Sequence, residues 1–361
     1  MPQGWPQQYG PPPGWGPSPS PQPFAAPPAP EPRPSALPVT PREYHEFFRA
    51  PRFRWWKPIL SLLMFGALFL LASTVVPGIA ILIDLAAGRV RVEDLTSGNP
   101  SQIAQAVLTP LGFTANNLAL ALSIPMAGLT GWAVYGQRPR WMSSIVGGFR
   151  WRLAGQFALV ALPIFLLSTG LDMALAGVPE FRWNPDSLFL IVVILLTTPF
   201  QSAGEEYGLR GLVARSIGSW FSARRLGLAV AAVLSSLLFM VLHGADNLWL
   251  NIYYFCVGMI CSVLAWRTGG LEAPVALHVC NNLVSEINLP FGGLEGMFDR
   301  GPGAVGPEIL FQLLFTLAVM AGMLWLAGRR SLQRTAAPAA VPVARADADR
   351  GVFFDPTHTI A

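Results

Sequence analysis

The chain has 361 residues, of which 52% are hydrophobic and only 12% are charged, and its formal net charge is +4. Soluble domains carry about 25% charged residues, so the composition excludes an ordinary soluble protein and indicates an integral membrane protein. Arginines in the loops account for the positive net charge, and this distribution is typical of membrane proteins rather than of nucleic-acid binding. We therefore expect the lipid bilayer as a partner and no nucleic acid.

The N-terminal region, residues 1–57, combines a proline-rich tail with a basic segment that precedes the first apolar run. Residues 1–41 contain 16 prolines, and such a composition cannot build a hydrophobic core. The first apolar run begins near Pro58, too far along the chain for a cleaved signal peptide. We predict a disordered, cytoplasmic N-terminal tail and a second disordered tail over residues 329–361.

Residues 58–328 contain eight apolar segments, each long enough to cross a hydrocarbon layer of about 30 Å. The segments are 58–83, 113–136, 153–172, 188–204, 227–245, 248–266, 271–288 and 307–328. The seventh is the weakest because polar residues interrupt it. The sequence predicts an all-α fold, a polytopic membrane helix bundle with about eight transmembrane helices.

The basic residues are distributed unevenly between the two sides of this bundle. If the N-terminus is cytoplasmic, the inside segments carry 17 of them and the outside loops carry four. Such an excess on the inner side is typical of membrane proteins. We therefore expect a multi-pass protein of the cell membrane with both termini in the cytoplasm.

Six polar side chains stand out against the apolar background: Glu205, Glu206, Arg210, His243, His278 and Asn282. An ionisable group at membrane depth costs at least a few kcal/mol, so it is usually paired and usually functional. A spacing of four residues predicts an ion pair between Glu206 and Arg210 on one helix face. The same spacing places Asn282 on the face of His278 and lets Phe239 pack against His243. The three cysteines lie in apolar segments, and we expect them to be small buried hydrophobic residues.

Together these groups suit hydrolysis, and two schemes stay open. A carboxylate can act as general base on water while histidine or asparagine N–H groups stabilise an oxyanion. Alternatively, His243, His278 and Glu206 can hold Zn²⁺ with one position open for water, and this donor set favours the zinc scheme. Both schemes require the glutamate carboxylates and the two histidine rings to converge, on the order of 4–7 Å apart. The chain has no HExxH motif, and its nearby serines have no GxSxG context.

The strings EEYGLRG, FMVLH and HVCNN resemble, in this order, the three motifs of the CPBP family. This family comprises the CAAX-protease and bacteriocin-processing intramembrane proteases, also called Abi, with the patterns EExxxR, FxxxH and HxxxN on separate membrane helices. The match covers roughly residues 185–290, and it departs from the family at Leu209, where phenylalanine is frequent.

The resemblance implies a CAAX-type intramembrane metalloendopeptidase, for which a metal-free glutamate mechanism is also argued. By this resemblance Glu205 and Glu206 supply the carboxylate that activates water, and Arg210 orients them. The remaining implied site residues are His243, His278 and Asn282. The implied substrate is a peptide or protein, with a lipid-modified C-terminus in the eukaryotic relatives, which remove the C-terminal tripeptide from prenylated CAAX proteins. The rival hypothesis is a non-catalytic membrane scaffold or bacteriocin-immunity protein that keeps the protease fold.

The expected depths of the site residues do not agree if all helices are straight. His243 lies 18 residues after Arg225, which is about 27 Å of helix, whereas His278 lies 11 residues after Arg267, about 16 Å. Residues 215–227 mix aromatic residues with arginines. Either this stretch lies at the cytoplasmic interface or the fifth span is strongly tilted. We expect the stretch to be amphipathic and interfacial.

Overall fold

The apolar runs form long helices, because a helix satisfies its own backbone hydrogen bonds within a hydrocarbon layer. The structure is a computed structural model that describes residues 34–294 and 300–340. Seven helical segments within these residues are long and apolar enough to cross a membrane. Large apolar side chains such as Leu63, Leu70 and Leu82 are exposed along the first of them, as lipid contact requires. The expected fold class, a polytopic bundle of membrane helices, is confirmed.

Three of the seven segments precede the site in the sequence, and four contain or follow it. They are α1 (Lys57–Ala86), α4 (Pro110–Ala121) with α5 (Ser123–Thr130) and η2 (Gly131–Tyr135), α7 (Trp151–Ala176), α8 (Ser187–Glu206) with η3 (Tyr207–Ala214) and α9 (Arg215–Trp220), α10 (Arg224–Leu242), α11 (Leu248–Thr268) and α14 (Ile309–Arg329). The shorter elements are β1 (Arg42–Glu43), η1 (Tyr44–Glu46), α2 (Val92–Leu95), α3 (Pro100–Ala106), α6 (Arg140–Ser143), α12 (Glu272–Ser285), α13 (Leu289–Gly292) and β2 (Thr335–Ala336).

The seventh predicted span differs from the expectation, because its helix α12 has only 14 residues. That length corresponds to about 21 Å, which is short for a membrane span. The segment nevertheless connects the two ends of the bundle. Just before α12, Gly270 bridges to Ser144, and just after it the carbonyl of Pro290 accepts a hydrogen bond from Ser187 at the start of α8. The structure therefore has seven helices of spanning length and one short helix in place of the eighth.

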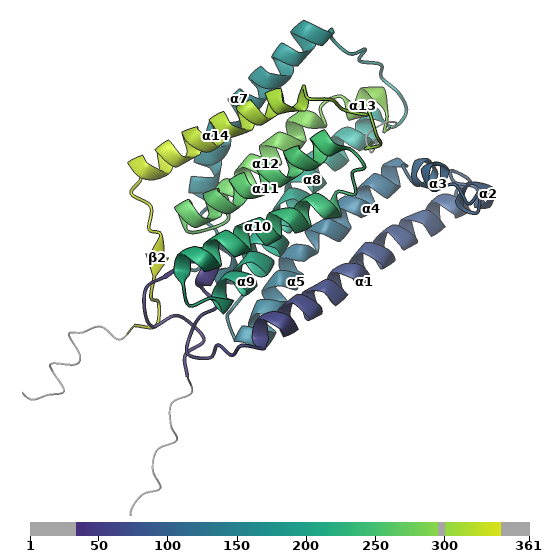
Figure 1. The fold of residues 1–361 in the computed structure, drawn as a ribbon. Helices are drawn as coiled ribbons and strands as arrows, with labels where there is room; N and C mark the ends of the chain where they lie inside the picture. Colours follow the sequence, from purple (N-terminus) through teal and green to yellow (C-terminus); the bar gives the residue numbers. More distant parts are fainter. Residues whose placement is uncertain (1–33, 295–299, 341–361) are drawn as a thin grey trace, which may run out of the picture. The chain divides into compact units, whose positions relative to one another are not determined.

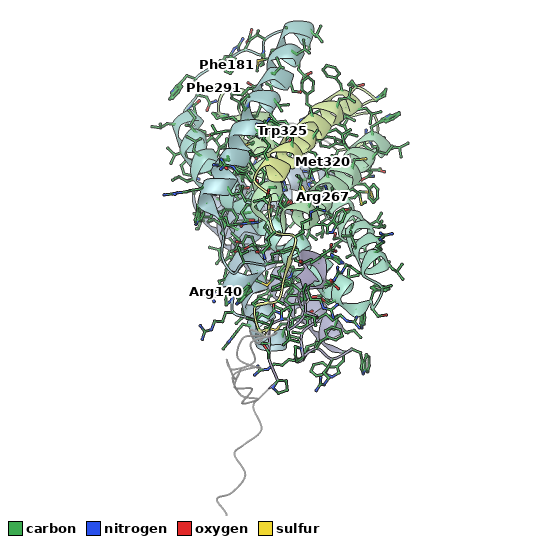
Figure 2. The ribbon with its side chains drawn as sticks, turned by 90° about the vertical axis from the view of Figure 1, so that its left-hand side faces the viewer. Arg140, Phe181, Arg267, Phe291, Met320 and Trp325 are labelled. Atoms are coloured by element: carbon green, nitrogen blue, oxygen red, sulfur yellow. The ribbon has the colours of Figure 1, made fainter. Side chains whose placement is uncertain are left out.

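The segments that flank the first and last spans meet in a small antiparallel sheet. Strand β1 precedes α1, strand β2 follows α14, and the two strands pair with each other. The start of α1, α9 and β2 therefore lie at one end of the bundle, whereas α2, α3 and α13 lie at the other (Figure 1). Figure 2 shows Arg140 toward the first end and the neighbouring Phe181 and Phe291, with ring centroids 5.2 Å apart, at the opposite end. Both flanks lie at the same end of the bundle, so the chain between them runs the length of the bundle an even number of times.

The fourth predicted span, residues 188–204, is much shorter than the helix in the structure. Helix α8 continues through η3 and α9 as one segment of 34 residues, Ser187–Trp220. Residues 215–219 are all buried within the protein, so the expectation of an interfacial stretch is wrong for them, whereas Trp220 and residues 222–226 are exposed. Glu206 consequently lies within a long helix, far from its end, and contacts His278, while Phe239 lies against both histidines, so the three motifs meet at one depth.

Arg215 explains why this polar stretch can be buried. Its guanidinium donates hydrogen bonds to the Trp141 carbonyl at 2.9 Å and to Gln137 Oε1 at 3.1 Å. It also lies over the rings of Tyr44 and Phe48, 5.0 and 4.2 Å from their centroids, an arrangement that stabilises a cation away from water. The N-terminal segment and the loop of residues 137–141 thus together supply the surroundings that a buried arginine needs.

The parts of the two tails that adjoin the bundle are folded. Tyr44 and Phe47 are buried against the helices, and burial raises the pKa of Tyr44 and lowers the pKa of His45. Strand β2 lies within the predicted C-terminal tail. The predicted tail boundaries, 1–57 and 329–361, remain predictions, because residues 1–33 and 341–361 lie outside the described residues.

Candidate functional site

The paired glutamates lie where α8 passes into η3. The π-helical turns of η3 begin directly after Glu206, and such turns are rare and frequently occur at functional sites. At Gly204, α8 touches α4 so closely that an added Cβ would lie 2.1 Å from the carbonyl oxygen of Leu120. Because Gly204 has no side chain, the helix that carries both glutamates can pack directly on α4.

Glu206 is fully buried and holds three elements together. Its Oε1 accepts hydrogen bonds from Arg210 Nη1 and from His278 Nδ1, both at 3.0 Å. Arg210 also donates from Nη2 to the carbonyl of Gly258 in α11 at 3.0 Å, and its guanidinium lies 4.8 Å from the ring centroid of Phe239 in α10. The Glu206–Arg210 ion pair predicted from helical spacing is confirmed, and Glu206 fixes the ring of His278.

Glu205 points in a different direction and retains some exposure. Its side chain is 13% exposed, and its Oε2 lies 3.7 Å from His278 Nε2. Gln201, one helical turn earlier, donates a hydrogen bond from Nε2 to Glu205 Oε1. The ring of His278 is therefore enclosed by two carboxylates: buried Glu206 on Nδ1 and the more accessible Glu205 near Nε2.

His243 lies at the end of α10 among aromatic rings. Its ring contacts Phe239 edge-on, with centroids 4.4 Å apart, and stacks on Tyr254 at 4.0 Å. Phe239 also contacts His278, with centroids 5.7 Å apart, so one phenylalanine lies against both histidines. The carbonyl oxygen of Phe239 lies 2.7 Å from His243 Nδ1, which assigns the proton to Nδ1 and leaves Nε2 as an acceptor. The predicted packing of Phe239 on His243 is confirmed.

Asn282 occupies the face of α12 that carries His278, as the spacing predicts. Its Nδ2 donates to Gln201 Oε1 and to Ser202 Oγ, both at 3.2 Å. Gln201 in turn donates to Glu205. Asn282 is thereby connected to Glu205 through one intervening side chain.

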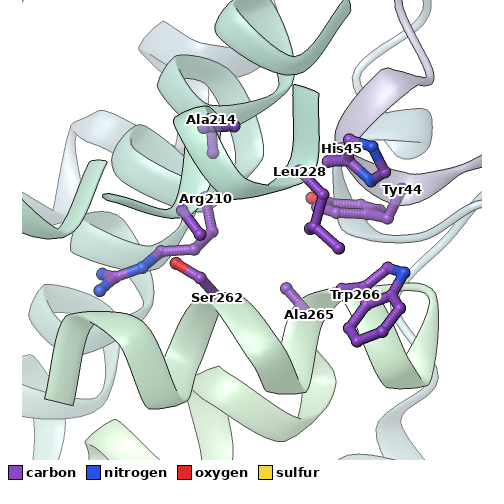
Figure 3. A pocket seen from close by; sticks show the side chains of 10 residues that line it. Tyr44, His45, Arg210, Ala214, Leu228, Ser262, Ala265 and Trp266 are labelled. Atoms are coloured by element: carbon purple, nitrogen blue, oxygen red, sulfur yellow. The ribbon is translucent and has the colours of Figure 1, made fainter. Parts of the chain in front are cut away.

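A small pocket lies on the other side of Arg210. Figure 3 shows Arg210 and Ser262 at one side of this pocket and Tyr44, His45 and Trp266 at the other. The N-terminal segment therefore reaches close to the arginine that holds Glu206. This contact is not visible in the sequence, where the tail and the motif are 160 residues or more apart.

The predicted zinc ligands were tested for their fit to a metal. Glu206 Oε1 is engaged by Arg210 and His278, whereas its Oε2 has no hydrogen-bond partner among the described residues. Across the described ranges, no group of three or more His, Cys, Asp and Glu side chains is placed to hold a metal ion. The set His243, His278 and Glu206 does not fit a zinc centre in this arrangement, so we derive no chemistry through a metal.

The structure brings the three predicted motifs together, with Glu205, Glu206, Arg210 and His278 in direct contact and His243 joined to them through Phe239. Sequence reasoning missed Gln201, although its spacing of four residues from Glu205 was a usable signal. It also missed Tyr254, for which the sequence offers no signal, since an aromatic residue in an apolar helix is ordinary. The three cysteines are free, and Cys261 and Cys280 are buried, as expected.

A comparison with known families matches the stretch of the chain that carries the three motifs. A family model described as Type II CAAX prenyl endopeptidase Rce1-like matches residues 185–284. The chain is 25% identical over 168 residues to the Uncharacterized protein YyaK of Bacillus subtilis (strain 168), covering 40% of this chain and 55% of that protein. It is 32% identical over 157 residues to an Uncharacterized 24.3 kDa protein of Escherichia coli, covering 39% of this chain and 67% of that protein. No solved structure matches the chain.

Proposed function

We propose that this chain is an intramembrane endopeptidase, because it belongs to the Rce1-like type II CAAX prenyl endopeptidase family. Residues 185–284 carry the match to this family of proteases. The chain hydrolyses a peptide bond with a water molecule activated by Glu205. The observation that carries this proposal is the unequal environment of the two glutamates. Glu206 is fully buried and bound by Arg210, whereas Glu205 is accessible and faces His278.

In the proposed mechanism Glu205 is the general base. Its carboxylate takes a proton from water, and the resulting hydroxide attacks the carbonyl carbon of the scissile bond. His243 assists, because its Nε2 is an acceptor that can hold the second hydrogen of the same water. Gln201 and Asn282 fix the direction of Glu205 through the hydrogen bonds described above.

The tetrahedral intermediate carries negative charge on oxygen, which needs a donor. His278 is suited to this role, because Glu206 accepts the hydrogen bond from Nδ1 and stabilises the imidazolium form, in which Nε2–H is offered to the oxyanion. Glu206 and Arg210 are positioning residues: Arg210 neutralises Glu206, and Glu206 orients His278. Collapse of the intermediate breaks the C–N bond, and the departing nitrogen takes the proton that Glu205 had accepted.

We further propose that the two flanks joined by the β1–β2 sheet lie in the cytoplasm. Arg210 and Arg215 are buried within the bundle, yet the remaining inside segments still hold 15 basic residues against four in the outside loops, which supports this orientation. The proposed substrate is a membrane-associated peptide or protein, with a lipid-modified C-terminus as one candidate class.

Cleavage in proteoliposomes tests the proposal. The full chain is incubated with a peptide ending in a farnesylated CAAX sequence and with its unmodified counterpart, and released fragments are identified by mass spectrometry. We expect a defined product that disappears in Glu205→Gln and persists in Glu308→Gln, an exposed acid outside the site. Equal product from the Glu205→Gln protein would show that the cleavage does not arise from this site.

A further inference from the structure

Helices α8 and α12 face each other through the site in three successive polar pairs, which we call the polar ladder. The pairs are Glu205 with His278, Gln201 and Ser202 with Asn282, and Thr198 with Glu286. The first two pairs belong to the site proposed above. In the third, Thr198 Oγ1 donates a hydrogen bond of 2.6 Å to Glu286 Oε2. Since His278, Asn282 and Glu286 are spaced by four residues, Glu286 continues the catalytic face beyond the family motifs.

Glu286 differs from the other buried acids in the described part of the chain, because no arginine or lysine forms an ion pair with it there. Each of the other buried acids has an arginine partner: Glu46 with Arg42 and Arg224, Asp84 with Arg89, Glu206 with Arg210, and Glu272 with Arg150. Glu286 is only 8% exposed, and within the described residues its one hydrogen-bond partner is the hydroxyl of Thr198. A buried carboxylate without a cation is costly, and such groups within a membrane bundle usually serve a function.

The length of the polar ladder fits an extended peptide. Glu286 lies eight positions after His278, at the C-cap of α12, which corresponds to about 12 Å along the helix axis. An extended chain covers this distance in three to four residues, since each residue adds about 3.3 Å. A peptide that lies along the ladder with its scissile bond at Glu205 therefore brings a residue three or four positions away to Glu286.

We propose that Glu286 is a specificity-determining residue, and that it binds a cationic group of the substrate three or four residues from the scissile bond. A lysine or arginine side chain of the peptide supplies the cationic partner of Glu286. For every other buried acid in the described residues, an arginine of the chain itself is that partner. Thr198 holds Glu286 Oε2, so Oε1 is free for the incoming ammonium or guanidinium group. The neutral Asn117, which donates to Thr198 Oγ1 at 3.3 Å, adds no competing charge. This inference rests on the proposed peptidase function.

The test compares peptides that differ only in one side chain. A single lysine, or the uncharged norleucine, is placed at the third or fourth position on either side of the scissile bond, and kcat/KM is measured in proteoliposomes. At one of these positions we expect lysine to be preferred about 10- to 100-fold, the range of a hydrogen bond to a charged group. In Glu286→Gln, which retains an acceptor for Thr198, the ratio should fall to about one, and in Glu308→Gln it should be unchanged. Glu286→Lys should instead prefer a glutamate-containing peptide.

A binding measurement separates this inference from the peptidase function itself. A fluorescent lysine peptide is titrated onto the Glu205→Gln protein and onto Glu205→Gln/Glu286→Gln, and we expect the double variant to bind about 10- to 100-fold more weakly. Cleavage without any lysine preference, or a preference that persists in Glu286→Gln, would overturn the role of Glu286 and leave the peptidase intact. If the binding difference is present but no peptide is cleaved, the cationic site stands and the peptidase proposal fails.

Discussion

Replacing Arg210 with methionine should destabilise the fold strongly, because it leaves a buried carboxylate without its cation. Arg210 is 1% exposed and Glu206 is fully buried, and the arginine makes both the 3.0 Å ion pair and the 3.0 Å bond to the Gly258 carbonyl. Removing one partner of a buried pair costs about 3–5 kcal/mol, a large part of the 5–15 kcal/mol that stabilises a typical protein. We therefore expect Arg210→Met to lose about 3–5 kcal/mol of unfolding free energy.

The double variant Glu206→Gln/Arg210→Met removes both charges, so it should recover most of that loss while remaining inactive, because His278 is no longer oriented by a carboxylate. Denaturant or thermal unfolding of the purified proteins in mixed micelles measures the difference. Arg182→Met is the matched control, since Arg182 and its partner Glu180 are 79% and 73% exposed and such pairs contribute little. The reasoning is refuted if Arg210→Met unfolds like the control, or if the double variant is no more stable than Arg210→Met.

Two further predictions concern packing and metal. Gly204→Ala should lower the free energy of unfolding by about 1–3 kcal/mol through overpacking, because its Cβ would meet the Leu120 backbone. Gly170 has open space around it, so Gly170→Ala should be neutral or slightly stabilising. Equal effects of the two substitutions in unfolding assays would contradict this account. Incubation with a strong zinc chelator should leave turnover unchanged, since no group of three or more His, Cys, Asp and Glu side chains in the described residues is placed to hold a metal ion. Loss of activity that added zinc restores would reinstate the set His243, His278 and Glu206.

Local spacing predicted the site contacts that lie within one helix. Glu206 with Arg210 and Phe239 with His243 are both four residues apart, and the period of the α-helix is enough to place such pairs together. The approach of α8, α10 and α12 to one another depends on tertiary packing. Single-sequence reasoning reached it only because the three motifs resemble a family in which they share a site.

The extent of the fourth helix was underestimated because charged residues, from Glu205 to Arg215, follow its apolar run. An arginine after an apolar run ordinarily marks the membrane interface, yet here Tyr44, Phe48 and the Trp141 carbonyl surround it. Tyr44 and Phe48 come from the segment before the first span, which was predicted to belong to the cytoplasmic tail, and Trp141 comes from the loop after the second span. The length of α12 was missed for a related reason: its polar residues face α8 within the bundle, so hydropathy alone does not show where the helix ends.

The most direct test of the central claim is the separate replacement of the two glutamates. Glu205→Gln should remain as stable as the wild type, because Glu205 is partly exposed and pairs with His278 but with no arginine of the described residues. It should lose about 10²–10⁴-fold in kcat, the usual contribution of a general base. Glu206→Gln should lose stability as well as activity, since Arg210 is then buried without an acid. Cleavage by Glu205→Gln at near the wild-type rate, with a stable but inactive Glu206→Gln protein, would contradict the assignment of Glu205 as the base.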